Sequence, residues 1–442
     1  MNKKGVRVTK QRYNNYSHEL AYKAVDACFD RKWLRTDVLE FIEEYTGISR
    51  KEIYKDTLNQ SVLVKMEVAE SLACFVDDMV DDIMNNRMID YIDPVTIKSR
   101  PDGMTHKMRD IASLSIPHQF LGHIVKLGLD PLLKARLLPT QHASIPGRGQ
   151  TKLKNQIGWY LRRKRLNINF AVKTDIVHAY ASVKYLDVIK FLKREIPSAK
   201  WIIKLLTFLS ILAPDGHLII GGYIDAWLFN LMMSYAIRDL MKQGYMRRGK
   251  FHPYVVRVVT YMDDFTILTS TRIGAKKAIR YLSKWLHTNL LLTIKQTTSI
   301  FVLDTMEEER RARCLARPSS RGCPAVDMGG FMIHRTYVTI RPRIFKRIAR
   351  CFSRAWRELQ NTGTIQRQRA AVIISRYGYF KQTTSKYLRC KYHVDEILRM
   401  AKKVNSFWSR LRARETKEWL YHAVSKYQSR LAASQSNPRI AW

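Results

Sequence analysis

The sequence lacks the signatures of zinc-binding, secreted and repeat proteins. None of its six cysteines forms a Cys-x-x-Cys pair, which argues against zinc sites. No internal repeat and no low-complexity linker is visible, which argues against solenoid and fibrous architectures. Residues 1–20 contain no apolar segment of the kind that directs secretion. These absences predict a cytoplasmic globular protein whose cysteines stay reduced.

Long apolar runs are also scarce. Residues 216–237 are nearly long enough to cross a bilayer. However, Asp225 lies at the centre of this run, where a charge is costly in lipid, and Asn230 adds another polar group. A buried core helix satisfies the same pattern, so we expect no membrane segment.

Acidic side chains are few relative to basic ones. The 442 residues include 77 Lys and Arg against 38 Asp and Glu, a formal net charge of +39. Such a surface attracts polyanions, of which nucleic acid is the usual one, although a membrane surface or a ribosome-like assembly would also explain the charge. The 46% hydrophobic content predicts a globular protein with a sizeable core and several subdomains.

The hydrophobic pattern changes along the chain. Apolar residues recur at helical spacing at both ends, and the helical pattern after Arg343 is strongly basic. Strand-like patterns occupy the middle, so the pattern predicts an α+β fold. We expect a strand within residues 167–175, a hairpin at 256–270, a single strand over 291–303 and a short hairpin at 328–342. The longest apolar helical block is expected at 201–241, and a charged, exposed insertion at 304–327.

Two adjacent carboxylates, Asp263 and Asp264, lie between two β-branched apolar runs in residues 256–270. A tight turn between paired strands holds its side chains rigidly at a sheet edge. Metal-assisted phosphoryl transfer places two magnesium ions about 3.5–4 Å apart, and shared carboxylates offset their charge. Asp175 follows another apolar run and is the expected third ligand. A plain polar turn is the alternative, but the pair lacks the following glycine of a two-residue hairpin.

A second acidic cluster has helical i, i+4 spacing. It comprises Asp77, Asp78, Asp81 and Asp82. Facing acidic helices hold magnesium in prenyl-diphosphate enzymes, but no second helix of this kind is present. The pattern therefore favours a solvated helix face.

The motif Tyr261-Met262-Asp263-Asp264 resembles the palm signature of reverse transcriptases, and further segments follow in that family's order over residues 95–390. The resemblance implies a right-hand polymerase with fingers, an antiparallel-sheet palm and a helical thumb, preceded by a helical extension. The implied boundaries are 1–95 for the N-terminal helical extension, 96–170 for the fingers, 171–340 for the palm (with the helical segment 205–241 and the insertion 304–327), and 341–442 for the basic thumb and C-terminal tail.

The resemblance also implies roles for individual residues. Asp175, Asp263 and Asp264 would bind the metal ions and carry catalysis. Tyr180 falls at the aromatic position that excludes a 2′-hydroxyl, although a core tyrosine is the commoner explanation. The residues implied in nucleotide binding are Lys107, Arg109, Arg148, Tyr180, Gly221 and Lys295, and those implied in other substrate contacts are Tyr261, Met262, Asn230, Gly329 and Gly330.

One segment departs from the family pattern. Ile220 stands where the family has Gln, and Asp225 where it has Ser. These changes put template-strand contacts in doubt and argue against a group II intron maturase. The sequence is most similar to enzymes of diversity-generating retroelements and to bacterial phage-defence reverse transcriptases. The helical extension favours the defence branch.

The function implied is RNA-directed DNA synthesis in bacterial anti-phage defence, with two Mg²⁺ ions, or Mn²⁺ in their place. The partners would be deoxynucleoside triphosphates, a structured non-coding RNA template and the DNA product. A diversity-generating enzyme, an RNA-templated RNA polymerase and an inactive RNA-binding relative are the alternatives. The sequence leaves open the primer (RNA, DNA or a protein hydroxyl) and whether residues 1–95 bind RNA, an identical subunit or a partner protein.

Overall fold

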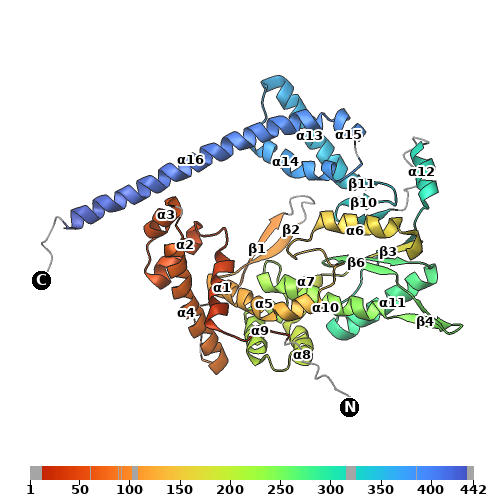
Figure 1. The fold of residues 1–442 in the computed structure, drawn as a ribbon, viewed down its shortest axis with the longest axis horizontal. Helices are drawn as coiled ribbons and strands as arrows, with labels where there is room; N and C mark the ends of the chain where they lie inside the picture. The colour runs from red at the N-terminus through yellow and green to blue at the C-terminus, as the bar shows by residue number, and fades with distance from the viewer. Residues whose placement is uncertain are drawn as a thin grey trace, which may run out of the picture. The chain divides into compact units, whose positions relative to one another are not determined.

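The computed structural model describes residues 12–59, 61–87, 89–90, 92–101, 108–314, 325–384 and 386–435 (Figure 1). Helices and small antiparallel sheets make up the fold, as the sequence predicts. The chain divides into two compact units. The first comprises Met1–Tyr16, Ile83–Phe345 and Gln382–Ser385, and the second comprises Ser17–Asp82, Lys346–Lys381 and Lys386–Trp442.

A four-stranded antiparallel sheet with the order β6-β7-β3-β8 is the centre of the first unit. In the register, Asp175 on β3 lies opposite Asp264 on β7, and Phe170 at the other end of β3 lies opposite Val302 on β8. The strands are β3 (Phe170–Asp175), β6 (Arg257–Tyr261), β7 (Asp264–Thr269) and β8 (Ser299–Val302).

Helices surround this sheet. Helices α10 and α11 pack against its strands, and α10 is buried along most of its length, which explains its mostly apolar sequence. In the part of the chain that the structure describes, no helix has the length and apolarity needed to span a membrane. The helices of this unit are α5 (Ile116–Arg136), α6 (Gln150–Arg162), α7 (Ala179–Ser182), α8 (Tyr185–Glu195), α9 (Lys200–Leu212), α10 (Tyr223–Met241), α11 (Arg272–Leu290) and α12 (Met306–Cys314), with 3₁₀ turns at Lys164–Leu166 and Pro214–Gly216.

Smaller sheets complete the first unit. A three-stranded sheet lies over the face of the large sheet that carries Lys173 and Thr266, where Thr266 Oγ1 is 3.2 Å from the sulfur of Met328. Strands β1 and β2 form an antiparallel hairpin, and residues 102–107 between them lie outside the described residues. The strands are β1 (Thr96–Pro101), β2 (Met108–Ser113), β4 (Gly244–Arg247), β5 (Lys250–Pro253), β9 (Val326–Met328), β10 (Phe331–Ile333) and β11 (Val338–Ile340).

Two local predictions are wrong. The segment 291–303 is not one continuous strand, because Thr298 turns back to bond the carbonyl of Lys295 and only Ser299–Val302 joins the sheet. The predicted insertion is not wholly exposed either. Glu309 on α12 is buried, because its carboxylate accepts hydrogen bonds from the loop between β10 and β11.

The second unit is helical and joins both ends of the chain. Tyr54 on α3 packs against Trp419 on α16, with ring centroids 4.8 Å apart. Helices α4 and α13 cross from one unit into the other. The helices that contribute to it are α1 (His18–Phe29), α2 (Thr36–Thr46), α3 (Arg50–Leu58), α4 (Leu63–Asn85), α13 (Pro342–Thr362), α14 (Arg367–Lys381), α15 (Lys386–Lys391) and α16 (Val394–Gln435).

Candidate active site

The turn between β6 and β7 brings the predicted carboxylates to one edge of the large sheet. Tyr261 pairs with Asp264, so Met262 and Asp263 form a two-residue turn. Met262 has a φ of 54°, the conformation found at the first central position of hairpin turns of types I′ and II′. Asp175 lies directly opposite Asp264 on the neighbouring strand. The structure therefore places Asp175, Asp263 and Asp264 together.

The charges at this edge repel one another. The carboxyl groups of Asp263 and Asp175 are within hydrogen-bonding reach. Burial raises the pKa of Asp263 to about 7, and the charges of Asp175 and Asp264 act in the same direction. Burial also raises the pKa of Asp264, against the opposing effect of Lys173. A positive charge nearby would therefore favour the ionised forms of Asp263 and Asp264.

Lys295 supplies part of that charge. Its ammonium group donates a hydrogen bond to Oδ2 of Asp175, and this bond raises the pKa of Lys295. Its backbone N–H also donates to the carbonyl oxygen of Asp175, at 2.8 Å. The turn at residues 295–298 thus directs Lys295 toward the carboxylates. Its predicted contact with a nucleotide stays a prediction.

The other oxygen of Asp175 fits a metal ion. Within the described residues, Asp175 Oδ1 is buried and accepts no hydrogen bond. No group of three or more His, Cys, Asp or Glu side chains forms a ready-made metal cage in that same part of the chain. Mg²⁺ does not need such a cage in phosphoryl-transfer sites, because one or two carboxylates, water and substrate phosphates complete its coordination. Asp175 and Asp263 match that ligand set.

A charge network that the sequence did not reveal lies beside Asp264. Asp327 on β9 accepts from Lys173 at 3.3 Å and from Arg341 at 2.5 Å. All three residues influence the pKa of Asp264. The one sequence signal for this network is that Asp327 stands between the apolar residues Val326 and Met328. Because side chains alternate along a strand, the Asp327 side chain lies on the opposite side from these two buried residues.

Asn230 supports the β6–β7 turn from within the core. It is only 1% exposed, and its side-chain amide donates to the carbonyl of Ala143 at 3.1 Å and contacts the sulfur of Met262 at 3.5 Å. Gln141, which is fully buried, donates to the carbonyl of Asn230 at 2.6 Å. Asn230 therefore ties the segment around Ala143 to the turn, and its predicted contact with substrate stays a prediction.

Arg148 braces the same segment. Its guanidinium donates to the carbonyls of Leu138 and Gln141, at 2.5 and 2.8 Å. Burial lowers the pKa of Arg148. His142, the residue after Gln141, pairs with β6, because its backbone N–H donates to the carbonyl of Thr260. In this structure Arg148 thus holds protein backbone, and nucleotide binding by it stays a prediction.

Gly221 and Asp225 shape the loop before α10. Gly221 has a φ of 112°, and a Cβ atom there would lie 2.7 Å from the carbonyl oxygen of Ala112 on β2. The Asp225 carboxylate accepts from Ile219 N at 2.9 Å and from the Tyr185 hydroxyl at 2.8 Å. Burial raises the pKa of Asp225 to about 6. The unusual Asp225 is therefore an anchor of this loop against α8.

The remaining predicted residues lie elsewhere or cannot be placed. Arg109 is exposed on β2, opposite Arg100. Lys107 lies outside the described residues, and so does the side chain of Tyr180 on α7. Gly329 and Gly330 form the turn between β9 and β10, both with positive φ.

The rival acidic cluster has the expected solvated face. Asp78 and Asp81 on α4 are exposed, whereas Met79 and Val80 between them are buried. Asp77 pairs with His18 at 2.5 Å. This arrangement explains the helical spacing of the acidic residues without a metal ion.

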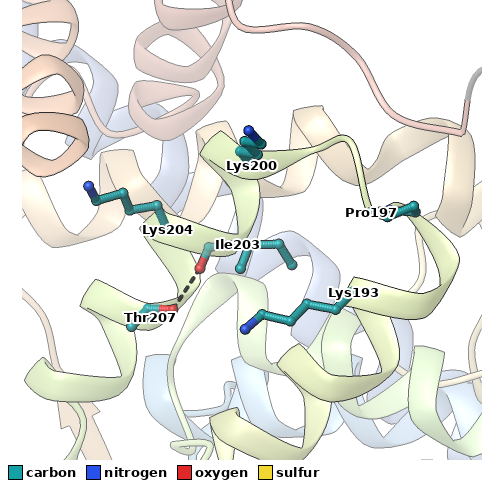
Figure 2. Close-up of a pocket in the computed structure, with 6 residues that line it drawn as sticks. All are labelled: Lys193, Pro197, Lys200, Ile203, Lys204 and Thr207. Carbon is teal, nitrogen blue, oxygen red and sulfur yellow. Dashed lines mark hydrogen bonds between the residues drawn. The ribbon is translucent and has the colours of Figure 1, made fainter.

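A cavity of about 530 Å³ between α8 and α9 contains none of these carboxylates. Three of its lining residues are lysines, but their ammonium groups lie well apart (Figure 2). Lys204 donates to the carbonyl of Met84 at 2.5 Å. The lysines therefore do not converge on one ligand position.

Comparisons with known proteins leave the family open. No protein-family model matches this sequence, and no curated protein matches it. A solved structure of telomerase from Candida albicans, in complex with a TWJ fragment of telomeric RNA, is similar with a TM-score of 0.37 and 12% identity. The likeness covers 72% of this chain and 61% of that telomerase chain. A TM-score this low supports no argument about fold or function.

Proposed function

We propose that this protein is an RNA-directed DNA polymerase of the reverse transcriptase type. The observation that carries the proposal is the β6–β7 turn, which presents Asp263 beside Asp175, whose buried Oδ1 accepts no hydrogen bond from the described residues. Crowded carboxylates on a rigid sheet edge are suited to hold divalent cations, and divalent cations are what nucleotidyl transfer requires.

The chemistry follows from these side chains. Asp175 and Asp263 would hold two Mg²⁺ ions, with Asp264 close enough to add charge. When bound, Mg²⁺ would stabilise negative charge on the attacking and leaving oxygens. The primer hydroxyl gives up its proton to water as its oxygen bonds to the α-phosphorus of a deoxynucleotide, and the bond to pyrophosphate breaks, so that pyrophosphate leaves with the electron pair. Lys295 offsets negative charge beside Asp175 throughout.

The template is proposed to be RNA, on the basis of charge and resemblance. A net charge of +39 suits a polyanionic duplex held mainly through phosphate contacts. The exposed β1–β2 hairpin carries Arg100 and Arg109, and α16 carries further basic residues. A structured non-coding RNA and a role in phage defence are the finer proposal. Diversity generation is the alternative.

Primer extension tests the proposal. Purified protein is given an RNA template, an annealed DNA primer and deoxynucleotides with Mg²⁺. We expect extension by the wild type and by Asp78→Asn, whose carboxylate is exposed on α4, but not by Asp175→Asn or Asp263→Asn. Equal extension by all four proteins would refute the catalytic assignment. If none of the proteins extends the primer, the protein is better explained as an inactive RNA-binding relative of polymerases.

Substrate choice separates the polymerase classes. The proposal expects deoxynucleotides to be preferred, and Tyr180→Ala to admit ribonucleotides. A wild-type protein that prefers ribonucleotides would be an RNA polymerase instead. Sequencing the RNA and DNA that co-purify with the protein would then distinguish defence from diversity generation.

A further inference from the structure

A second cavity, which has a polar lining, lies at the opposite end of the large sheet from the carboxylates. It has a volume of about 400 Å³, within the range of small-molecule sites. Its lining includes Asn169, which directly precedes β3, and Thr305, which follows β8. The six-residue strand β3 spans roughly 17 Å between this end and Asp175, at about 3.3 Å per residue.

A fixed guanidinium forms part of the lining. Arg335 donates to the carbonyls of Asp304 at 2.6 Å, Leu161 at 2.7 Å and Ile168 at 2.5 Å. These three bonds leave two of the five N–H donors of a guanidinium outside them. Burial lowers the pKa of Arg335, as expected for a cation held away from bulk solvent. Arg335 is therefore a positioned donor rather than a freely moving surface cation.

The charged side chains that line the cavity are mostly cationic, although the carboxylates of Glu309, Asp304 and Glu308 also lie close enough to act on the pKa of Arg335. Arg162, Arg163 and Lys164 line the same cavity and are exposed, and among the described residues Glu307 is the one acidic side chain in the lining. The neighbouring carboxylate of Glu309 is occupied by the backbone N–H groups of Arg335 and Thr336 and by the Thr336 hydroxyl. Cations therefore outnumber carboxylates in the described lining of the cavity.

An exposed aromatic ring adjoins the cationic rim. Trp159 on α6 is 41% exposed, and the Arg163 guanidinium lies 4.3 Å from its ring centroid. A partly exposed aromatic ring beside exposed cations is a combination that binds single-stranded nucleic acid, by stacking on the ring or on the guanidinium that covers it and by charge. Simple anions would not need the ring.

We propose that this cavity binds the phosphate group of a nucleotide, with the base placed to stack near Trp159. The site is separate from the catalytic turn, so it would hold a nucleotide outside the reaction. The proposal does not depend on polymerase activity. The nucleotide can belong to an RNA strand or be free, and the two sources are separated by experiment.

The first experiment measures binding of a labelled single-stranded RNA to the full chain over a range of salt concentrations. We expect Arg162→Ala/Arg163→Ala to weaken binding several-fold and to reduce the salt slope by roughly 0.7 for each phosphate that the variant no longer neutralises. Glu307→Gln should change affinity in the opposite direction. The control is Lys193→Ala/Lys200→Ala, which removes two charges that are also exposed, from the α8–α9 cavity (Figure 2).

Two results would overturn the proposal. One is a loss of affinity in the lysine control equal to that in the arginine variant, which would indicate general surface charge. The other is an unchanged affinity in Glu307→Gln together with an unchanged salt slope in the arginine variant. Primer extension in the same preparations keeps the two proposals apart, since either can fail without the other.

A second experiment identifies the source of the phosphate. Chemical modification of arginine, read by mass spectrometry at Arg162 and Arg163, is compared without ligand, with adenosine monophosphate and with the RNA. Protection by the mononucleotide supports a free-nucleotide site, and protection by RNA alone supports a strand-holding site. Modification that neither ligand reduces would refute the site.

Discussion

The two ends of the β6-β7-β3-β8 sheet carry opposite charges. At the β6–β7 turn, Asp175 and Asp263 face each other. At this carboxylate end the described residues leave one oxygen of Asp175 without a hydrogen bond, while Lys295 pairs with the other oxygen. At the other, cationic end the side chains of Arg335 and Glu309 each make three hydrogen bonds within the protein.

This difference indicates how each end depends on ligands. Buried groups without partners cost free energy, so the carboxylate end is stable only to the extent that the rest of the fold compensates. The cationic end contributes to stability through its internal bonds, even before a ligand binds. Removing a carboxylate at the first end should therefore raise the free energy of unfolding, whereas removing a bonded group at the second end should lower it.

The largest expected effect is on catalysis. Asp263→Asn should reduce nucleotide incorporation on the order of a thousandfold, because a metal ligand contributes several kcal/mol to stabilising the transition state. Single-nucleotide incorporation under single-turnover conditions measures the loss. RNA binding measured on the same variant should stay within about twofold of the wild type. The proposed phosphate site lies roughly 17 Å from the substituted residue, a distance over which salt screens the lost charge. A parallel loss of RNA binding would show that the two ends are not independent.

The next effect concerns Glu309. Glu309→Ala removes the acceptor of bonds from Arg335 N, Thr336 N and the Thr336 hydroxyl, each 2.8 Å long. Leaving these three part-buried donors unpaired should lower the free energy of unfolding by roughly 3 kcal/mol. Denaturant titration measures the change. Glu307→Ala is the matched control on the same helix, because Glu307 is exposed and should change stability by less than about 0.5 kcal/mol. Equal effects would mean that burial of Glu309 does not matter.

The carboxylate end could be predicted from the sequence because its parts are local. Two β-branched runs around Asp263 and Asp264 define a hairpin by themselves, and the strand ending in Asp175 needs only to pair with it. The antiparallel register then brings Asp175 opposite Asp264. Short-range pattern was enough to find these residues, although not to establish what they bind.

The cationic end and the supporting contacts could not be predicted in this way. Arg335 reaches carbonyls that lie 167 and 174 residues away in the chain, and no local pattern marks such a contact. Lys295 reaches Asp175 because its segment bends where a continuous strand was expected. The grouping of the N-terminal helices with α13–α16 likewise depends on long-range packing, such as that of Tyr54 on Trp419.

Asp225 is a buried carboxylate that combines features of both ends: it is hydrogen-bonded, but its burial still disfavours the charged form. It accepts two hydrogen bonds, yet burial raises its pKa from 3.8 to about 6. Because the folded-state pKa is above the unfolded value, the folded protein holds the proton more tightly. This contribution to stability is therefore fully present below about pH 4 and is lost as the pH rises to about 6.

A neutral side chain should remove that dependence. Relative to Asp225→Asn, the wild type should lose about 2 kcal/mol of unfolding free energy between pH 4 and pH 6, at 1.36 kcal/mol for each pKa unit. Thermal or denaturant unfolding of both proteins over this pH range measures the difference. Parallel curves for the two proteins would show that Asp225 does not titrate there.

The smallest expected effect is also the most direct test of the contrast. In metal-free buffer, Asp263→Asn should raise the free energy of unfolding by about 1 kcal/mol, because it removes one of the carboxylates that repel each other. Asp327→Asn is the comparison at a satisfied carboxylate, and it should lower stability because Lys173 and Arg341 lose their partner. Adding Mg²⁺ should then stabilise the wild type and Asp327→Asn, but not Asp263→Asn, since only a protein that binds the ion gains stability from it. If Asp263→Asn is instead destabilised without Mg²⁺, Asp263 is held by the fold in the same way as Asp327, and the contrast between the two ends of the sheet disappears.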